Sequence, residues 1–375
     1  MPANRLQQLH DAGQSIWLDF IDRSILRNGD LTRRITEDAL TGMTSNPTIF
    51  EKALAEGVSY DDQLKGASAK STAMDLFELV ETTDVRDACD LFKGVYASTN
   101  GGDGYVSIEV SPGAANSASE TVAEAQRLWS TVSRPNVMIK VPGTTEGAAA
   151  VRTLIAAGIN VNITLLFAID AYAHIIDAYM GGLEDRVAAG KPIDRIASVA
   201  SFFVSRVDTE VDKRIDALAT QGGADKARLN SLKGKAAVAN ARIAYKLFRD
   251  RTATPRWKAL ADKGARLQRP LWASTGTKNP AYSDVLYVEQ LIGPDTVNTM
   301  PPATIEAFRD HGNAARSVDS DNAGAERTLG ELAAVGIDMK SVTDKLLTEG
   351  LASFQKSFDS LIAGLEKKRA PALKT

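Results

Sequence analysis

Eight short apolar segments, each rich in β-branched residues and ending in small or polar residues, recur along the 375-residue chain. Several are apolar on both faces, which is typical of parallel strands buried between helices. Helical periodicity fills the intervals, and this alternation predicts an α/β fold with right-handed crossovers. Eight strands favour a closed (β/α)8 TIM-type barrel, with an open doubly wound sheet as the alternative. The predicted strands are 15–20, 39–46, 105–111, 136–141, 159–164, 196–203, 270–275 and 296–300.

The helical segments continue well beyond the last predicted strand. Gly158 and Gly190 stand at expected C-terminal caps, because glycine adopts the left-handed conformation that ends many helices. No shift in composition marks a boundary, so we expect a single domain, 1–375, with a C-terminal helical extension over about 303–368. The clearest helices are predicted over 117–132, 146–158, 167–190, 232–250, 303–312, 322–335 and 340–368, and 222–231 is predicted to connect two helices.

The overall charge and the distribution of apolar residues argue against several classes of protein. The formal net charge is −3 and the sequence pI is about 5.8, so the chain has no global basic field for nucleic acid. The apolar runs have the length of strands, and no membrane span is expected. The N-terminal segment has no apolar signal core, which favours a cytoplasmic location. The sequence leaves a monomer and a homodimer both open.

Lys140 interrupts an otherwise apolar strand in the segment NVMIKVPGT. A lysine in a strand that is covered on both faces must either extend its head group to solvent or point into a polar cavity. Burial in a cavity removes water from the ammonium group and favours the free amine, which is a nucleophile. Taken alone, Lys140 is more simply interpreted as an edge-strand lysine with a solvated head group.

Polar residues at the ends of the other predicted strands favour the cavity instead. In a barrel the carboxyl ends of the strands meet at one mouth, where such enzymes place their chemistry. Asp19 and Glu109 supply two carboxylates that can move protons beside an amine. Each residue alone is equally compatible with a helix cap or an ion pair, but the whole set favours an active site. The set is Asp19, Thr44, Asn46, Glu109, Asn162, Thr164 and Ser201.

A site for an anion is predicted after the sixth and seventh strands. Arg206 follows the sixth strand where a helix begins, and a helix N-terminus with a guanidinium group binds anions. The loop 274–280 after the seventh strand carries Lys278, and loops after the later strands of barrels commonly hold phosphate. The alternative is a surface arginine paired with Asp208 or Glu210.

Several apparent motifs do not support other chemistry. The glycine-rich segment 101–104 precedes a strand, so it is not a dinucleotide-binding turn. The segment 319–324 lacks the later ligands of a calcium loop, and the three histidines lack zinc-type spacing. The one cysteine, Cys89, lies in a helical pattern beside acidic residues and is expected to pack rather than react. No metal site is expected.

Four segments of the chain resemble signatures of the transaldolases, in the same order along the chain. They are TSNPTIF (44–50), NVMIKVPGT (136–144), INVNITLLF (159–167) and SFFVSRVD (201–208). The segment 271–293 is similar to the longer bacterial branch of that family. The resemblance implies a (β/α)8 barrel of the class I aldolase-like type, circularly permuted so that the reactive lysine lies on the fourth strand.

The resemblance implies catalytic roles for the residues that match these motifs. Lys140 would attack the C2 carbonyl of a ketose and form an imine (Schiff base), which accepts electrons when the carbon–carbon bond breaks. Asp19 would take the proton of the C4 hydroxyl group. Glu109, through a water held by Thr164, would move protons during imine formation and hydrolysis.

The resemblance also implies how the substrate is held. Arg206 would bind the phosphate group of donor and acceptor. Many family members carry an arginine in the loop after the seventh strand, where this chain has Ser274 and Lys278, so a point charge replaces a bidentate guanidinium. The hydroxyl groups of the dihydroxyacetone unit would contact Asn46 and Asn162, with Thr44 and Ser201 nearby.

The implied reaction is that of a transaldolase in the non-oxidative pentose phosphate pathway. Sedoheptulose 7-phosphate would donate three carbons to glyceraldehyde 3-phosphate, giving erythrose 4-phosphate and fructose 6-phosphate without a metal or organic cofactor. One alternative is a fructose-6-phosphate aldolase, a lyase using the same lysine; such relatives often carry a tyrosine where Phe203 stands. The others are a non-catalytic sugar-phosphate binding protein and a pyridoxal-phosphate enzyme.

Overall fold

The computed structural model describes residues 4–56, 59–66, 70–221 and 225–372. Its strands form one closed barrel in chain order, all pairs are parallel, and β8 closes on β1. Each predicted strand begins and ends within two residues of an observed one, so the (β/α)8 prediction is confirmed and the open sheet is wrong. The strands are β1 (Gln14–Asp19), β2 (Leu40–Thr44), β3 (Tyr105–Glu109), β4 (Val137–Pro142), β5 (Val161–Leu166), β6 (Ser198–Phe203), β7 (Gln268–Ala273) and β8 (Thr296–Met300).

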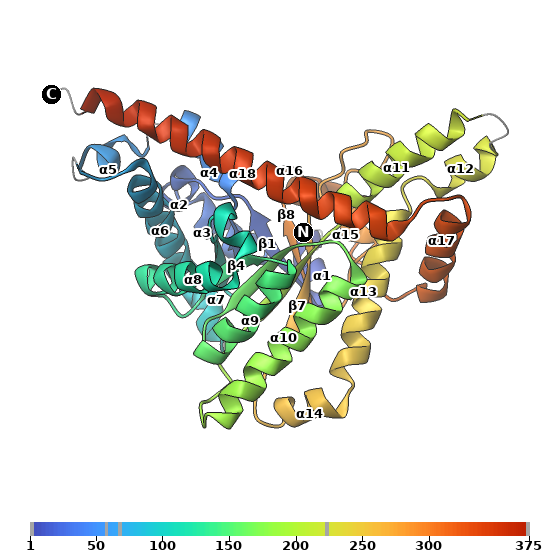
Figure 1. Ribbon diagram of the computed structural model, residues 1–375, viewed down its shortest axis with the longest axis horizontal. Coiled ribbons are helices and arrows are strands. Elements are labelled where there is room, and N and C mark those ends of the chain that lie inside the picture. Colours follow the sequence, from blue (N-terminus) through green and yellow to red (C-terminus); the bar gives the residue numbers. More distant parts are fainter. Residues whose placement is uncertain (1–3, 57–58, 67–69, 222–224, 373–375) are drawn as a thin grey trace.

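Helices surround the strands and connect each to the next, as α8, α9, α10 and α13 do in Figure 1. The helices before β4 are α1 (Arg5–Asp11), α2 (Arg23–Arg27), α3 (Asp30–Glu37), α4 (Pro47–Glu56), α5 (Asp61–Gly66), α6 (Ala73–Leu91), α7 (Lys93–Ser98) and α8 (Ala118–Val132), with a 3-10 helix, η1, at Pro112–Asn116. Those after β4 are α9 (Thr145–Ala157), α10 (Ile169–Ala188), α11 (Ser205–Ala219), α12 (Lys226–Leu232), α13 (Ala236–Thr252), α14 (Pro255–Ala261), α15 (Leu286–Glu289), α16 (Pro302–His311), α17 (Asn322–Ala334) and α18 (Met339–Ala372).

The prediction that 222–231 only connects two helices is wrong for its second half, and its residues 222–224 lie outside the described residues. Asp225 caps a short helix, α12, by accepting a hydrogen bond from the backbone N–H of Arg228. Gly234, with φ of +69°, then turns the chain, so α13 begins at Ala236 rather than at residue 232. The cap at Asp225 and the left-handed Gly234 therefore separate α12 from α13, a division that helical periodicity alone does not predict.

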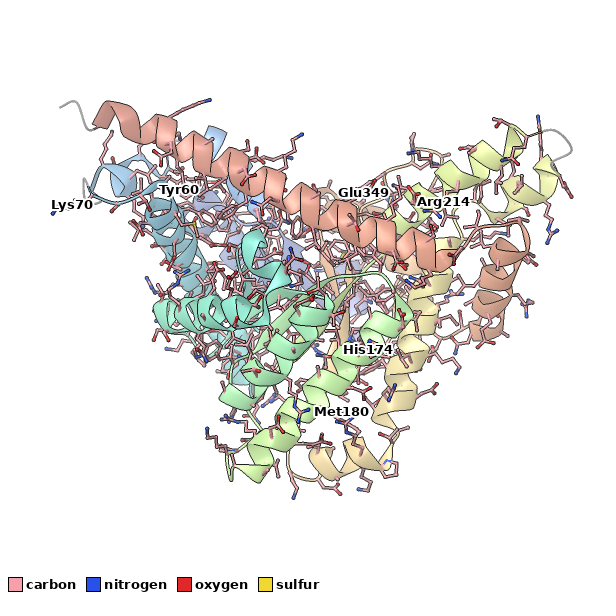
Figure 2. The ribbon with its side chains drawn as sticks, in the orientation of Figure 1. Tyr60, Lys70, His174, Met180, Arg214 and Glu349 are labelled. Carbon is pink, nitrogen blue, oxygen red and sulfur yellow. The ribbon has the colours of Figure 1, made fainter. Side chains whose placement is uncertain are left out.

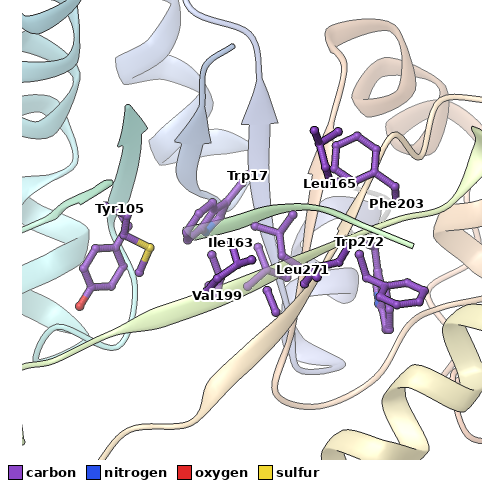
Figure 3. Close-up of a cluster of buried hydrophobic side chains, with 14 of the residues drawn as sticks. Trp17, Tyr105, Ile163, Leu165, Val199, Phe203, Leu271 and Trp272 are labelled. Atoms are coloured by element: carbon purple, nitrogen blue, oxygen red, sulfur yellow. The ribbon is translucent and has the colours of Figure 1, made fainter. Parts of the chain in front are cut away.

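The core of the barrel combines large apolar side chains with a small polar cluster. Trp17, Val199 and Leu271, all fully or almost fully buried, lie among the side chains of Figure 3. The indole N–H of Trp17 donates to Asp103 at 2.9 Å, and Arg269 lies 3.5 Å from the same carboxylate. These contacts satisfy the buried polar atoms beside the apolar packing.

The last helix, α18, crosses one end of the barrel, and in Figure 1 it runs along the top of the molecule from α4 and α5 to α11 and α17. Side-chain contacts hold α18 against α4 at one side of the barrel and against α11 at the other. On the α4 side, the hydroxyl groups of Thr48 and Ser357 lie 2.8 Å apart. On the α11 side, Lys345 pairs with Glu210 at 2.9 Å, and Figure 2 labels Glu349 and Arg214 in this region. The predicted C-terminal helices are therefore present, and the last of them, α18, covers one end of the barrel.

None of the described helices combines the length and the apolar character that crossing a membrane requires.

We expect Gly42→Ala to destabilise the protein, because Gly42 lies opposite Trp17 and an added Cβ would lie 2.5 Å from the indole. Overpacking of this kind costs about 1–3 kcal/mol. Gly330→Ala is the matched control: this exposed residue inside α17 has open space around it, so the change should stabilise by about 0.5–1 kcal/mol. Chemical denaturation should show a lower free energy of unfolding for Gly42→Ala and a higher one for Gly330→Ala. An unchanged free energy of unfolding in Gly42→Ala would contradict the close contact between Gly42 and Trp17.

Candidate active site

Lys140 lies on β4 in register with Glu109 on β3 and Asn162 on β5. Its side chain does not reach bulk solvent: the residue is 5% exposed. The Nζ atom donates to the backbone carbonyl of Ser45 at 3.0 Å and to Oε2 of Glu109 at 3.3 Å. The alternative of an edge-strand lysine with a solvated head group is therefore excluded, and the amine points into the mouth of the barrel.

Asp19, at the end of β1, belongs to a short hydrogen-bonded chain. Thr44 donates its hydroxyl proton to Oδ1 of Asp19 at 2.9 Å, and its oxygen lies 2.7 Å from the hydroxyl oxygen of Thr299. A hydroxyl group has one proton, so Thr299 is the donor in the second bond. Burial raises the pKa of Asp19, while Lys140, Thr44 and Arg206 oppose that rise.

Glu109 is the second carboxylate beside the amine. Burial raises the pKa of Glu109, the charge and hydrogen bond of Lys140 oppose the rise, and the negative charge of Asp19 adds to it. The positive charge of Lys140 thus acts on the pKa of both buried carboxylates, Asp19 and Glu109. Groups whose pKa values are raised in this way can accept and return protons closer to neutral pH than ordinary carboxylates.

Asn162 and Thr164, both on β5, differ in their hydrogen bonding. The amide of Asn162 donates to Ser107 at 2.9 Å and accepts from the hydroxyl group of Ser201 at 2.7 Å. Both ends of this amide are therefore bound within the protein, and Asn162 fixes the position of Ser201. The hydroxyl group of Thr164 is buried without a hydrogen-bond partner in the described part of the chain, so it is available to a small polar molecule in the cavity.

A cavity of about 450 Å³ opens at this end of the barrel. Ten of the twelve site residues predicted from the sequence line it, while Glu109 and Asn162 lie behind its wall. The ten are Asp19, Thr44, Asn46, Lys140, Thr164, Ser201, Phe203, Arg206, Ser274 and Lys278. Asn46 also caps α4, because its side-chain oxygen accepts from the N–H of Ile49 at 3.0 Å.

Three residues that bear on the site were not among the site residues predicted from the sequence. Ser45 acts through its backbone carbonyl, which no side-chain pattern reveals. Thr299 lines the cavity and is the polar residue nearest the end of β8, the same signal that identified the other strand ends. Phe354 lines the cavity from α18, and nothing in its local sequence distinguishes it from a packing residue.

Two cations face each other at one side of the cavity. Arg206 lies in the first turn of α11, with its guanidinium carbon 5.2 Å from the centre of the Phe203 ring. Burial lowers the pKa of Arg206. Desolvation at the cavity mouth, followed by repulsion from Arg206, lowers the pKa of Lys278. Like charges held this close favour binding of an anion between them.

Neither predicted surface partner is available to Arg206. Asp208 accepts from the N–H of Ala237 at 2.7 Å and from Tyr287 at 2.9 Å. Glu210 pairs with Arg214 at 2.8 Å and with Lys345. The surface-pair alternative is therefore wrong, and no carboxylate among the described residues forms an ion pair with Arg206 or Lys278. Ser205 and Ser274, whose hydroxyl oxygens lie 3.0 Å apart, add donors next to the two cations.

Other chemistry finds little support in the structure. Cys89 is fully buried in α6, and burial raises the pKa of its thiol, which makes the reactive thiolate unfavourable. His174 is exposed on α10. Among the residues that the structure describes, no group of three or more histidine, cysteine or acidic side chains is placed to hold a metal ion.

Comparison with known proteins gives consistent matches over nearly the whole chain. The family described as "Transaldolase/Fructose-6-phosphate aldolase" matches residues 16–365. "Transaldolase 2" of Nostoc sp. is 47% identical over 98% of this chain and 98% of its own length. "Transaldolase" of Trichodesmium erythraeum is 46% identical over 98% of both chains, and "Transaldolase" of Thermobifida fusca is 47% identical over 95% of this chain and 96% of its own.

The closed barrel and the lysine within its mouth define a class I aldolase-like enzyme. Within that class the matches are specific, because they extend through the barrel and into α18. The chain belongs to the transaldolase/fructose-6-phosphate aldolase family, and its activity is that of a transaldolase. Its substrates are accordingly sugar phosphates.

We expect Lys278→Ala to lower kcat/KM for fructose 6-phosphate by roughly tenfold, because a charge-assisted contact to phosphate contributes about 1.5 kcal/mol or more. Activity with unphosphorylated fructose should hardly change. Lys258→Ala, an exposed lysine paired with Asp262 on the distant α14 side, is the control and should leave both substrates unaffected. Equal losses for fructose and its phosphate would exclude a phosphate contact at Lys278.

Proposed function

We propose that the chain transfers a dihydroxyacetone unit from sedoheptulose 7-phosphate to glyceraldehyde 3-phosphate through a Schiff base on Lys140. The products are erythrose 4-phosphate and fructose 6-phosphate, in the non-oxidative pentose phosphate pathway. The observation that carries the proposal is the position of the Lys140 amine, buried beside Glu109 on the wall of a cavity that also holds Asp19 and two cations. A reaction of central sugar metabolism also supports a cytoplasmic location.

Imine formation begins when the free amine of Lys140 adds to the C2 carbonyl of the ketose. Glu109 is 3.3 Å from the amine and takes its proton. The carbinolamine then loses its hydroxyl group as water, with Glu109 returning a proton through a water bound to Thr164. The unpartnered hydroxyl group of Thr164 supports this role for Thr164, and the raised pKa of Glu109 suits a group that both takes and gives a proton.

Carbon–carbon cleavage follows when Asp19 removes the proton of the C4 hydroxyl group. The C3–C4 bond breaks, its electrons move into the imine, and the aldehyde leaves while three carbons stay on Lys140. Addition of the bound unit to the carbonyl of glyceraldehyde 3-phosphate reverses these steps, with Asp19 returning a proton to the new hydroxyl group. The position of Asp19 on the cavity wall supports this role, because burial raises the pKa of its carboxyl group above the ordinary value.

The remaining residues bind and orient the substrate. Asn46, Thr44 and Ser201 offer hydroxyl and amide groups to the dihydroxyacetone unit from the cavity wall. Asn162 holds Ser201 and, because its amide NH2 group has a second proton to donate, can also contact a hydroxyl group of the dihydroxyacetone unit. The phosphate group lies between Arg206 and Lys278, with Ser274 as a further donor.

The main rival is lyase activity, release of free dihydroxyacetone, since the matched family includes fructose-6-phosphate aldolases. Phe203 supports transfer, because an apolar ring at the cavity wall gives no proton to the bound carbanion, as a tyrosine could. The cover that α18 provides also supports transfer by limiting access of water. A sugar-phosphate binding protein would have no use for a buried amine beside two carboxylates.

Borohydride reduction in the presence of fructose 6-phosphate should label the wild-type chain irreversibly, because an imine is reduced to a stable secondary amine. Peptide mapping should locate the label on Lys140. Lys140→Met should give neither label nor transfer, while Lys52→Met, an exposed lysine outside the inner cavity, should behave as wild type. A label on any other lysine, or none in the active wild-type enzyme, would rule out the proposed intermediate.

Transfer should decline on the acidic side at a pH above the value of about 4 at which ordinary carboxylates titrate. The reason is that Asp19 must be ionised to accept a proton, and its pKa is raised. Thr44→Val removes a hydrogen bond that lowers this pKa, so the acidic limb of kcat/KM should move to higher pH. A folded Thr44→Val enzyme whose acidic limb moves to lower pH would contradict the assignment of Asp19 as the base.

A further inference from the structure

Phe354 stands at the junction of two cavities at the mouth of the barrel. The inner cavity, of about 450 Å³, holds Lys140. An outer vestibule of about 710 Å³ lies between α4 and α18 and includes Thr48 and Lys52. Five residues line both: Asp19, Asn46, Arg206, Pro301 and Phe354. Four of them lie at or just after the ends of the barrel strands β1, β2, β6 and β8, and only Phe354 comes from α18. These five residues mark the boundary between the vestibule and the cavity that holds Lys140, and Phe354 is the only aromatic residue among the five.

The ring of Phe354 is held firmly although it borders open space. The residue is only 6% exposed while lining both cavities. One turn earlier, α18 passes so close to the barrel at Gly350 that an added Cβ would lie 2.9 Å from Leu165. Nearly one turn later, Ser357 lies within hydrogen-bond distance of Thr48 on α4. Contacts on both sides therefore fix the segment of helix that carries Phe354.

We propose that Phe354 is a specificity-determining residue that favours transfer over release of the bound three-carbon unit. This proposal rests on the Schiff base on Lys140 proposed above. After cleavage, the carbanion on Lys140 has two fates. It can add to an incoming aldehyde, forming a carbon–carbon bond while Asp19 gives its proton to the new hydroxyl group. Alternatively, it can take that proton at carbon, and one water then adds to the imine carbon, expels the amine and frees dihydroxyacetone.

Release consumes the one water that imine formation produced, so the net reaction is cleavage of the ketose into an aldehyde and dihydroxyacetone. Access of water to the inner cavity therefore affects release more than transfer. Phe354 lies at the boundary with the larger vestibule and, together with Phe203 at the end of β6, gives the inner cavity an apolar surface. The ring contacts no reacting atom in this scheme; it sets which second substrate, aldehyde or water, reaches the imine.

The test is the ratio of two rates measured on the full-length chain. Release of dihydroxyacetone is measured with fructose 6-phosphate alone, and transfer is measured with fructose 6-phosphate and erythrose 4-phosphate. Phe354→Ala joins the two cavities and should raise the ratio of release to transfer by roughly tenfold. Phe354→Leu, which keeps an apolar side chain, should give an intermediate ratio, and Phe354→Trp should keep the ratio at or below that of wild type.

Phe358→Ala is the matched control. Phe358 lies one turn further along α18, packs edge-on against Phe77 at 5.6 Å and is absent from the linings of both cavities. Its loss should lower stability and leave the ratio unchanged. An equal rise in Phe358→Ala and Phe354→Ala would mean that loosening of the helix, not the ring at the passage, controls release, and would overturn the proposal.

Borohydride trapping on each variant separates this proposal from the one on which it rests. If wild type gives no adduct on Lys140, the Schiff-base mechanism fails. If Phe354→Ala still forms the adduct but keeps the wild-type ratio, the role of Phe354 is overturned while the mechanism stands. Should Phe354→Ala not fold, Phe354→Leu decides, since an unchanged ratio in that folded variant overturns the proposal equally.

Discussion

The burial of one amine between a carboxylate and a backbone carbonyl, at the mouth of a closed barrel, is the constraint on which the rest of the site depends. Removing an ammonium group and a carboxylate from water costs several kcal/mol for each, and their attraction only roughly offsets it. Lys140 and Glu109 therefore contribute little net stability. Their placement suits imine formation, because a carboxylate 3.3 Å from the amine can take its proton and leave a nucleophile.

The barrel meets this constraint through its register. Glu109, Lys140 and Asn162 stand opposite one another on three consecutive strands, so the charged pair and the amide that holds Ser201 are set by backbone hydrogen bonds. On the other side of the mouth, Thr299 donates to Thr44, and Thr44 donates to Asp19. Asp19 is held by Thr44, and Glu109 is held by Lys140. The positions of the two carboxylates therefore depend on neighbouring strands and not on loops.

Much of this arrangement could be predicted from the sequence, and the reasons are physical. Strand ends such as Asp19, Glu109 and Thr164 carry polar groups after apolar runs, and barrel geometry brings such ends to one mouth. The failures have equally definite causes. The carbonyl of Ser45 has no side-chain signature, and the hydrogen bonds that hold Asn162 between Ser107 and Ser201 depend on contacts between strands that no sequence pattern reveals. Phe354 lies far from the other site residues in sequence, and only the course of α18 brings it to the cavity.

In the proposed mechanism, the strand ends and the covering helix α18 affect different steps of the reaction. Residues at the strand ends set charge and proton transfer, since their pKa values follow from burial and from one another. The helix α18 contributes the uncharged side chain of Phe354 to the lining of the inner cavity, and in the proposal above this ring affects which molecules reach that cavity. Under the proposed mechanism, substitutions at the strand ends should change whether the imine on Lys140 forms, whereas substitution of Phe354 on α18 should change how that imine divides between transfer and release. A barrel with the same strand ends but a different covering helix would accordingly form the same intermediate and divide it differently between transfer and release.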